Sequence, residues 1–403
     1  MANTSKAKEL IISLDPGFDS MKVIVNGLAF KFPFNILPIT YEQTRDLFQV
    51  NDDYFVIKDL ITNKLFLVGQ YAREKIYTDS SKDESFIQYM NKFYSDKRFV
   101  DPLFIYVLRT AINLSISKFL EVEQDYDLDD IKNMNITIGI ALPHTLRDVY
   151  GPTMKEILAG THKSEMTIGM MDNVHFEYTI QKDNIIVFSQ TLSAIICETT
   201  DDDGNMDYEK YEKLSQNGPT LILDAGYYTV GIMTVSKGVV NNETAESNTS
   251  FAMKNVNEKT AAQLPDVKDY MIEHLCNVNN GKMKTFNVET KKAEVFDVPS
   301  IRSQQLSEVC NALIDHIDEK FNYLQAVNHV LITGGTGSSY YDQIKKCYAT
   351  DRELFNEEDI MLVNSTLFNH EKPAEYGIAV GCYKGLKAVK LALSSPVENE
   401  SII

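Results

Sequence analysis

Two stretches of this chain share one pattern: an apolar strand, a turn that contains Asp-x-Gly, and a second apolar strand. In both, a hydroxyl residue follows the glycine by three positions. A single hairpin of this kind is common, whereas its repetition far along the chain indicates a duplicated domain that holds a ligand between its copies. The matching positions are Asp15, Gly17 and Ser20 in the first stretch, and Asp224, Gly226 and Thr229 in the second.

The first turn has the composition of a phosphate-binding site. Pro16 pre-sets the bend, and Gly17 can adopt the positive φ that other residues resist. A tight turn between strands directs several N–H groups into the bend, which suits phosphate oxygens. Ser20 adds a hydroxyl, Lys22 adds a positive charge, and Asp15 is placed to hold a hydrated Mg²⁺. For this stretch alone, an ordinary hairpin with a polar turn is the alternative interpretation.

A third stretch, His329–Ser339, predicts a strand that leads through glycines into a helix. In this arrangement the backbone approaches a ligand closely and a helix N-terminus faces it. The loop lacks the lysine of a P-loop and the spacing of a dinucleotide fingerprint, so it indicates neither. A plain strand–helix turn is the alternative. The glycine-rich loop consists of Gly334, Gly335, Thr336 and Gly337.

Length and charge narrow the class of protein. A chain of 403 residues fits two domains of ordinary size. Its net charge of −18 argues against direct binding to nucleic acid or to an anionic membrane, because phosphate groups attract basic surfaces. We expect no signal segment at the N-terminus and no apolar run long enough to span a bilayer. The five scattered cysteines favour free thiols in a reducing cytoplasm, and the seven unclustered histidines argue against a structural metal.

The pattern of apolar residues predicts both strands and helices, and an acidic, turn-rich stretch marks the first domain boundary. The N-terminal part begins as a β-meander, with a two-residue hairpin at Asn26-Gly27. We expect domain I to span residues 1–198 with a return over 378–403, and domain II to span 199–377. The acidic stretch Thr199–Glu209 resembles a calcium loop only superficially, so we interpret it as a solvated loop.

Further elements follow from the same pattern. Strands are expected at Tyr54–Leu60, Lys64–Gly69, Asn135–Leu142, Val174–Ile180 and Asn184–Phe188. Helices are expected after Asp101, at Gln190–Glu198 with Ser189 as the cap, at Lys254–Asn277, at Ile301–Asn322 and after Pro373, with a hairpin-containing loop at Val278–Ser300.

Taken together, these motifs resemble the actin/Hsp70/hexokinase ATPase superfamily, in family order and over nearly the whole chain. Within it, Lys22 is similar to the phosphate-contacting lysine of actin. The length and compact layout look most like bacterial plasmid-segregation actins of the ParM/StbA type. The motifs are the phosphate-1 hairpin Asp15–Lys22, the connecting helix from Gln190, the phosphate-2 hairpin Asp224–Thr229, the nucleoside loop Gly334–Gly337, and a second connecting helix that contains Gly377 and Gly381.

The resemblance implies an actin-like ATPase fold: two duplicated α/β domains, each with a mixed sheet flanked by helices, and ATP or GTP with Mg²⁺ in a cleft between them. It implies that Asp15 holds hydrated Mg²⁺, that Asp224 orients metal-bound or attacking water, and that Gln190 positions the hydrolytic water. For Gln190, a helix-start residue bonded to nearby backbone is the alternative. The nucleotide-binding residues it implies are Gly17, Phe18, Asp19, Ser20 and Lys22 in the first hairpin, Gly226, Tyr227, Tyr228 and Thr229 in the second, and Gly334, Gly335, Thr336 and Gly337 in the nucleoside loop.

Four positions in the two hairpins depart from the family pattern. Phe18 and Asp19 occupy turn positions that are often small or hydroxylic. Asp19 brings a carboxylate close to the phosphates, so we expect it to point away from them or towards the metal. The pair Tyr227-Tyr228 replaces a commonly smaller pair, and the third loop reads Gly-Gly-Thr-Gly.

The function that the resemblance implies is a filament-forming ATPase or GTPase, whose polymer grows with bound nucleotide and is destabilised by hydrolysis. A small-molecule kinase of the same fold is the alternative, with Asp224 or Asp148 as its base. An Hsp70-like chaperone and a membrane-tethered actin fit less well. For plasmid segregation, the partners would be further copies of this chain and a basic DNA-binding adaptor of the ParR type, because the chain itself is too acidic to bind DNA.

Overall fold

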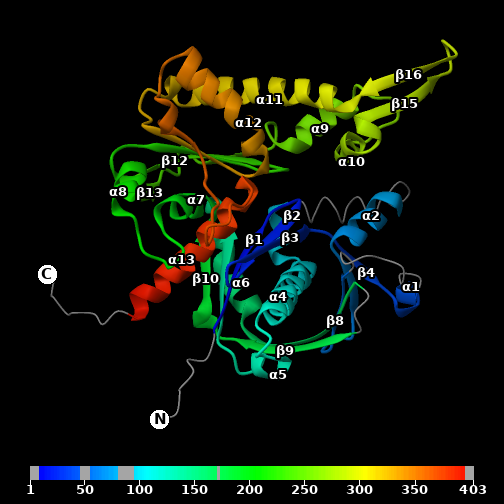
Figure 1. The fold of residues 1–403 in the computed structure, drawn as a ribbon, viewed down its shortest axis with the longest axis vertical. Coiled ribbons are helices and arrows are strands. Elements are labelled where there is room, and N and C mark those ends of the chain that lie inside the picture. Colours follow the sequence, from blue (N-terminus) through cyan, green and yellow to red (C-terminus); the bar gives the residue numbers. More distant parts are fainter. Residues whose placement is uncertain (1–8, 46–54, 80–94, 170–172, 395–403) are drawn as a thin grey trace. The chain divides into compact units, whose positions relative to one another are not determined.

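The computed structural model describes residues 9–45, 55–79, 95–169 and 173–394 of the chain (Figure 1). These residues form two compact units, which we describe separately. Unit 1 comprises Met1–Asp207, Ser365–Glu371 and Ile378–Ile403, and unit 2 comprises Tyr208–Asn364 and Lys372–Gly377. Each unit is therefore built from segments that are separate in the sequence.

A five-stranded mixed sheet forms the centre of unit 1. Strand β2 pairs antiparallel with β1 and β3, whereas β7 pairs parallel with β1 and β10. The predicted meander is confirmed, and Asn26 and Gly27 have positive φ values of 44° and 91°, as a two-residue hairpin requires. In pairing order, the strands are β10 (Ile185–Ser189), β7 (Ile136–Leu142), β1 (Leu10–Pro16), β2 (Ser20–Val25) and β3 (Leu28–Pro33).

Helix α4 (Pro102–Val122) lies in the core of unit 1 and packs against β1 and β2. It begins as predicted at Asp101, whose carboxylate accepts the N–H of Leu103 at 2.9 Å. Among the described residues, α4 also meets the length and hydropathy expected of a membrane-crossing helix, although 67% of that window is buried inside the protein. We did not expect an apolar run of this length, and its burial identifies a core helix.

The opposite face of the sheet is covered by α13 (Gly377–Ser394). A Cβ at Gly139 of β7 would lie 2.7 Å from the Cys382 sulfur of this helix, so the strand needs glycine for α13 to approach. A Cβ at Gly381 would lie 1.8 Å from the Ser193 carbonyl oxygen of a neighbouring helix. The small residues of α13 therefore permit close packing, as predicted.

A second, antiparallel sheet completes unit 1, and its order is β4-β6-β5-β8-β9. The predicted hairpin around Thr62-Asn63 is confirmed by the β5–β6 pairing, and Tyr54 lies outside the described residues. The strands are β4 (Ile36–Ile39), β5 (Phe55–Asp59), β6 (Leu65–Val68), β8 (Gly160–Ile168) and β9 (Val174–Ile180). The remaining helical segments are α1 (Tyr41–Arg45), α2 (Gln70–Asp79), η1 (Asp96–Val100), α5 (Leu128–Ile131), α6 (His144–Leu158), η2 (Lys182–Asn184) and α7 (Gln190–Thr199).

The central sheet of unit 2 repeats the central sheet of unit 1. Its order is β13-β12-β11-β17-β18, which corresponds strand by strand to β3-β2-β1-β7-β10. The directions also match, since β11 pairs antiparallel with β12 and parallel with β17. The predicted duplication is therefore visible in the topology. The strands are β11 (Thr220–Ala225), β12 (Val230–Ser236), β13 (Val239–Val240), β17 (His329–Thr333) and β18 (Ile360–Leu362), with β14 (Glu246–Asn248) beside β12.

The single helix predicted at Lys254–Asn277 is wrong. Two helices, α9 (Met253–Ala261) and α10 (Ile272–Asn277), replace it. Pro265 lies between them and cannot donate a helical hydrogen bond, and Asp266 follows with a positive φ of 55°. A proline and a left-handed residue in succession end the helix, although the apolar spacing continues through them.

The other elements of unit 2 agree with the prediction. The loop at Val278–Ser300 contains the β15–β16 hairpin, and the helix expected from Ile301 begins earlier, after an Asp297 cap. The elements are β15 (Lys282–Asn287), β16 (Lys292–Asp297), α11 (Val298–Lys320), α12 (Gly335–Lys345), α8 (Tyr208–Tyr211) and the short turns η3 (Glu212–Gln216), η4 (Asp269–Met271), η5 (Asn279–Gly281), η6 (Asn322–Leu324), η7 (Lys346–Asp351), η8 (Glu357–Asp359) and η9 (Ala374–Tyr376).

Candidate nucleotide-binding residues

The end of β1 brings three of the predicted site residues of unit 1 together. Asp15 and Lys22 face each other across the β1–β2 pair, with 3.8 Å between the Lys22 nitrogen and a carboxylate oxygen of Asp15. The side-chain amide of Gln190 donates to the other carboxylate oxygen at 3.1 Å. Asp15 is only 4% exposed. A buried carboxylate thus lies between a cation and an amide.

The parallel strands explain how Gln190 reaches Asp15. Strands β1, β7 and β10 run in the same direction, so their carboxyl ends share one edge of the sheet. Helix α7 starts directly after β10, which places its first residue at that edge. Ser189 is the N-cap residue of α7, as predicted, although its hydroxyl contacts His144 Nδ1 at 3.1 Å and makes no capping bond to the first turn of the helix.

Gly17 is needed for space and not for an unusual backbone angle. It is absent from the described residues with positive φ, contrary to our expectation. A Cβ at this position would lie 2.9 Å from the Lys22 nitrogen and 2.9 Å from the Ser20 carbonyl oxygen. Glycine therefore lets the Lys22 ammonium lie directly over the turn.

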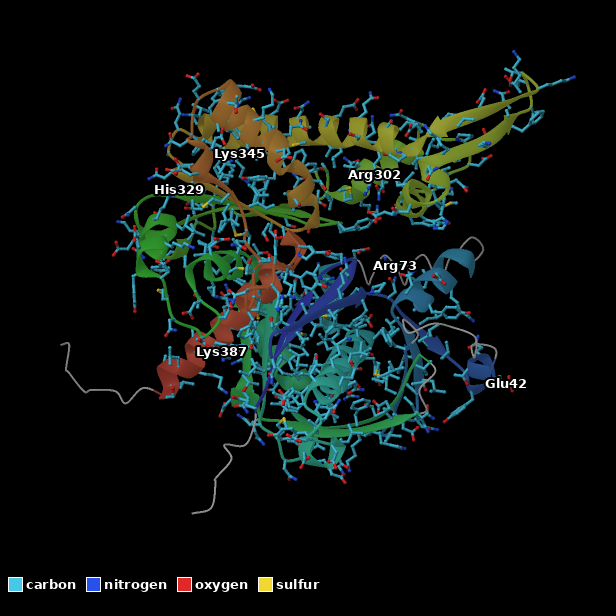
Figure 2. The ribbon with its side chains drawn as sticks, in the orientation of Figure 1. Glu42, Arg73, Arg302, His329, Lys345 and Lys387 are labelled. Carbon is cyan, nitrogen blue, oxygen red and sulfur yellow. The ribbon has the colours of Figure 1, made fainter. Side chains whose placement is uncertain are left out.

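The two unusual residues of this turn are each bound by an arginine. Asp19 accepts a hydrogen bond at 2.8 Å from Arg73 of α2, so its carboxylate points at a cation. Figure 2 labels Arg73. The guanidinium of Arg98 lies 3.8 Å from the centre of the Phe18 ring. Sequence reasoning missed both arginines, because no local motif marks them and each is far from the turn in the chain.

Arg98 also orients the peptides of the turn. It is 1% exposed and donates to the carbonyl oxygens of Pro16 at 2.8 Å and Gly17 at 3.2 Å. The C=O and N–H of a trans peptide point in opposite directions, so the N–H of Phe18 lies on the side away from Arg98. The arginine thus holds the turn from behind and directs the Phe18 N–H to the opposite side, whereas the Gly17 N–H donates to the Asp15 carbonyl at 3.0 Å.

The second turn, in unit 2, is joined to the glycine-rich loop. Gly226 closes the turn by donating to the Thr229 carbonyl at 2.9 Å. The Thr336 hydroxyl donates to the Gly226 carbonyl at 2.7 Å, and the N–H of Lys254 donates to the Tyr227 carbonyl at 2.8 Å. The first turns of α12 and α9 therefore both attach to this turn.

Gly334 permits the closest approach in this region. Its φ is +87°, and a Cβ would lie 2.2 Å from the Ala225 carbonyl oxygen. Helix α12 begins at the next residue, Gly335, and Gly337 packs on Ile332. Strand β11 ends beside this loop, where Asp224 is the register partner of Thr333.

The predicted site residues consequently form two groups, one in each unit. Both groups fit an anionic, cation-bound ligand by their chemistry: unit 1 supplies a buried carboxylate, an ammonium and a glycine-spaced turn, and unit 2 supplies a carboxylate, hydroxyls and the start of α12. In the unit 2 group, the ring of Tyr228 also contacts a cation, since the Lys254 nitrogen lies 5.5 Å from its centre. The groups are Asp15, Gly17, Phe18, Asp19, Ser20, Lys22 and Gln190 in unit 1, and Asp224, Gly226, Tyr227, Tyr228, Thr229, Gly334, Gly335, Thr336 and Gly337 in unit 2.

The fold is the α/β fold of actin-like proteins, as the motifs predicted. Neither the protein-family models nor the curated protein sequences contain a match to this chain. Solved structures do match it over nearly its whole length. The actin-like protein Alp7A superimposes with a TM-score of 0.68 at 16% identity and covers 96% of this chain and 98% of its own.

Two further structures illustrate the range of this likeness. A 15-stranded ParM filament from Clostridium botulinum matches with a TM-score of 0.65 at 18% identity, covering 94% of this chain and 99% of that one. The archaeal actin homologue Ta0583 in complex with ADP matches with a TM-score of 0.58 at 13% identity, covering 95% and 99%. The chain thus resembles the ParM and Alp structures in fold.

Proposed function

We propose that this chain is an actin-like NTPase that assembles into filaments with bound ATP or GTP and disassembles after hydrolysis. The observation that carries the proposal is the contact of Asp15 with both Lys22 and Gln190, at the end of the strand where the resemblance puts the metal and phosphates. The fold supports the proposal, since ParM and Alp12 are known as filaments and Ta0583 as an ADP complex.

In this proposal the two groups of residues bind one nucleotide and its Mg²⁺, and each predicted domain, 1–198 with 378–403 and 199–377, supplies one group. Asp15 would hold the hydrated cation, which takes most of its ligands from water and phosphate. Lys22 and the donors of the first turn would bind the outer phosphates, with the second turn, Gly226–Thr229, binding them from the other side. Bound Mg²⁺ would neutralise part of the negative charge of the phosphates.

Gln190 and Asp224 would act by orientation. The Gln190 amide is anchored to Asp15 at 3.1 Å, which fixes the direction of its remaining donor and its acceptor. An amide is a poor base, but phosphoryl transfer depends on positioning and charge neutralisation more than on proton abstraction. Asp224 would accept a hydrogen bond from water and hold its oxygen towards the phosphate.

The partners in this proposal are further copies of the chain and a basic adaptor of the ParR type that carries plasmid DNA. The net charge of −18 supports an indirect link to DNA, because a strongly acidic surface repels the phosphate backbone. The same negative charge disfavours binding of the chain to an anionic membrane. Free thiols at all five cysteines are compatible with a role in the cytoplasm.

Light scattering and phosphate release, measured together after addition of Mg-ATP or Mg-GTP, test the proposal. We expect wild-type scattering to rise and then decay as phosphate appears. In Asp224→Ala the rise should persist, because hydrolysis slows. Asp183→Ala, which removes an exposed carboxylate from a surface turn, is the matched control and should behave as wild type.

Two results would contradict the proposal. Flat scattering at concentrations well above micromolar, with phosphate transfer only when a sugar or another acceptor is present, would indicate the alternative kinase. Nucleotide affinity equal to wild type in Asp15→Ala, in a variant with unchanged circular dichroism, would show that the unit 1 group does not bind the nucleotide.

A further inference from the structure

A projecting hairpin in unit 2 exposes apolar side chains that have no partner among the described residues. We call Lys282–Asp297, which forms β15 and β16, the arm (Figure 1). Phe286 and Val295 share its outer face, where they are 64% and 57% exposed. Val288 near the tip is 78% exposed. Exposed apolar groups gathered on one short element indicate an interaction surface.

The arm is rigidly attached at its base. The opposite face of the hairpin carries Met283 and Phe296, which pack on the small cluster around Ile272 and Val298. A Cβ at Gly281 would lie 2.5 Å from the ring of Pro299, so the entry to the arm is closely packed. A two-stranded hairpin is marginal by itself, and this base stabilises it.

The tip of the arm is ordered as well. The Asn287 side chain accepts the N–H groups of Glu289 and Thr290, both at 3.0 Å. Lys291 follows with a positive φ of 53°. The arm is therefore preorganised, which lowers the entropic cost of binding through it.

A pocket of about 720 Å³ lies elsewhere in unit 2 and has the complementary chemistry. Its lining contains three carboxylates and no lysine or arginine, although Asp359 pairs with Lys213 at 3.5 Å and Glu357 with Lys345 at 3.3 Å from outside the lining. Leu354, 46% exposed, and Phe355 supply apolar surface. The three carboxylates are Glu353, Glu357 and Asp359, and Val327 and His329 also line the pocket. We call this the acidic pocket.

The arm and the acidic pocket lie at opposite ends of α11. The arm ends at Asp297, directly before the first residue of this helix, and the pocket wall begins at Val327, shortly after its last residue. A helix of 23 residues is about 35 Å long, at roughly 1.5 Å per residue. Figures 1 and 2 show the arm at one end of α11 and His329 towards the other. The arm cannot reach the pocket of its own chain.

The charges of the arm suit the acidic pocket. The arm carries four lysines against three carboxylates in a chain of net charge −18. Lys282 is paired with Asp297 at 2.6 Å, whereas Lys284, Lys291 and Lys292 form no ion pair with any described residue. Opposite charges at two separate surfaces favour one register of docking and speed the encounter.

We propose that the arm of one chain docks into the acidic pocket of a second copy, with Phe286 and Val288 against Leu354 and Phe355. This contact uses two different surfaces of one chain, so it is head-to-tail and can repeat without limit. This contact rests on the proposed self-assembly, and the arm and the acidic pocket would be the two surfaces through which the chains assemble. Phe286 is its central apolar residue, because it lies on the outer face between Lys284 and the tip.

Two single variants, mixed, test this contact. The arm variant Phe286→Asp has an intact pocket, and the pocket variant Leu354→Asp has an intact arm. We expect each alone to need at least about tenfold more protein than wild type to assemble, which corresponds to about 1.4 kcal/mol per contact. An equimolar mixture contains one complete arm–pocket pair, so sedimentation velocity should show dimers that neither variant forms alone.

Val239→Asp is the control, since it places the same charge on another exposed valine of unit 2, which is 68% exposed. It should assemble as wild type does. If wild type assembles and both variants assemble equally well, or if their mixture yields no dimer, the arm–pocket contact is overturned while self-assembly stands. If wild type stays monomeric with every nucleotide at high concentration, both the contact and the proposed function are overturned.

Discussion

The buried guanidinium of Arg98 lies 3.8 Å from the centre of the half-buried Phe18 ring, so the two groups form a cation–π contact in unit 1. The same guanidinium donates to the carbonyls of Pro16 and Gly17. A residue that looks out of place in a phosphate-binding turn, Phe18, therefore serves as a platform for the arginine that holds this turn. The departure from the family pattern has a structural purpose here.

Replacing this arginine is expected to weaken nucleotide binding. In Arg98→Ala the turn loses two charge-assisted hydrogen bonds, each of about 1.5–3 kcal/mol, and the cation that stacks on Phe18. We expect the nucleotide Kd to rise at least about tenfold. Isothermal titration with ATP and GTP measures it. Arg147→Ala is the control, because among the described residues the ion pair of Arg147 is with the adjacent, exposed Asp148. An unchanged Kd in Arg98→Ala would contradict the role of this residue in shaping the turn.

Alanine variants of two glycines with positive φ distinguish the cost of backbone strain from the cost of a steric clash. Gly160 has a φ of +102° and nothing within 4 Å of the position that a Cβ would take, whereas Gly334 has a φ of +87° and the Ala225 carbonyl at 2.2 Å. Both alanine variants carry backbone strain of about 1–2 kcal/mol. Only Gly334→Ala must also move β11. We expect its Tm to fall clearly further than that of Gly160→Ala, and equal shifts would show that the close approach relaxes at little cost.

The stability of unit 1 is expected to depend on pH through His162. Burial lowers the pKa of this imidazole from its usual 6.5, and the ring contacts the Leu158 carbonyl through Nε2 at 2.8 Å. Its Nδ1 has no partner among the described residues, so a second proton there would be unsatisfied. The unfolded chain then binds more protons below pH 6.5, and stability falls as the pH falls below that value.

Urea unfolding at several pH values between neutral and mildly acidic checks this dependence. In His162→Gln, which keeps a donor near the Leu158 carbonyl, the decline should be shallower by up to about 1.4 kcal/mol per pH unit. The exposed His175 provides the control variant His175→Gln. The same decline in His162→Gln and in wild type would assign the pH dependence to other groups.

The cysteines should fall into two classes of reactivity. Burial raises the pKa of the thiols of Cys197, Cys310 and Cys382 to about 12, so they remain protonated and inert. Cys276 and Cys347 are partly exposed. A thiol reagent at mildly alkaline pH should label these two first and all five after denaturation. Early labelling of Cys382 would indicate that α13 detaches readily from the sheet.

The sequence by itself determined the duplication and the residues at the strand ends. The alternation of apolar residues and the paired Asp-x-Gly turns are local signals, and each hairpin forms between neighbours in the chain. The glycine-rich loop was also predictable from local sequence, because the strand and the helix that flank it are its neighbours in the chain. The helix predicted across Pro265 failed where local backbone chemistry overrode apolar spacing.

Only the tertiary structure decided what surrounds those residues. Arg73 and Arg98 reach the first turn from elements far along the chain, and Gln190 meets Asp15 because parallel strands share an edge. The need for glycine at position 17 came from the Lys22 ammonium, not from a backbone angle. The physical reason is common to all three: a contact between distant segments depends on how sheets and helices pack, and packing leaves no periodic trace in the sequence.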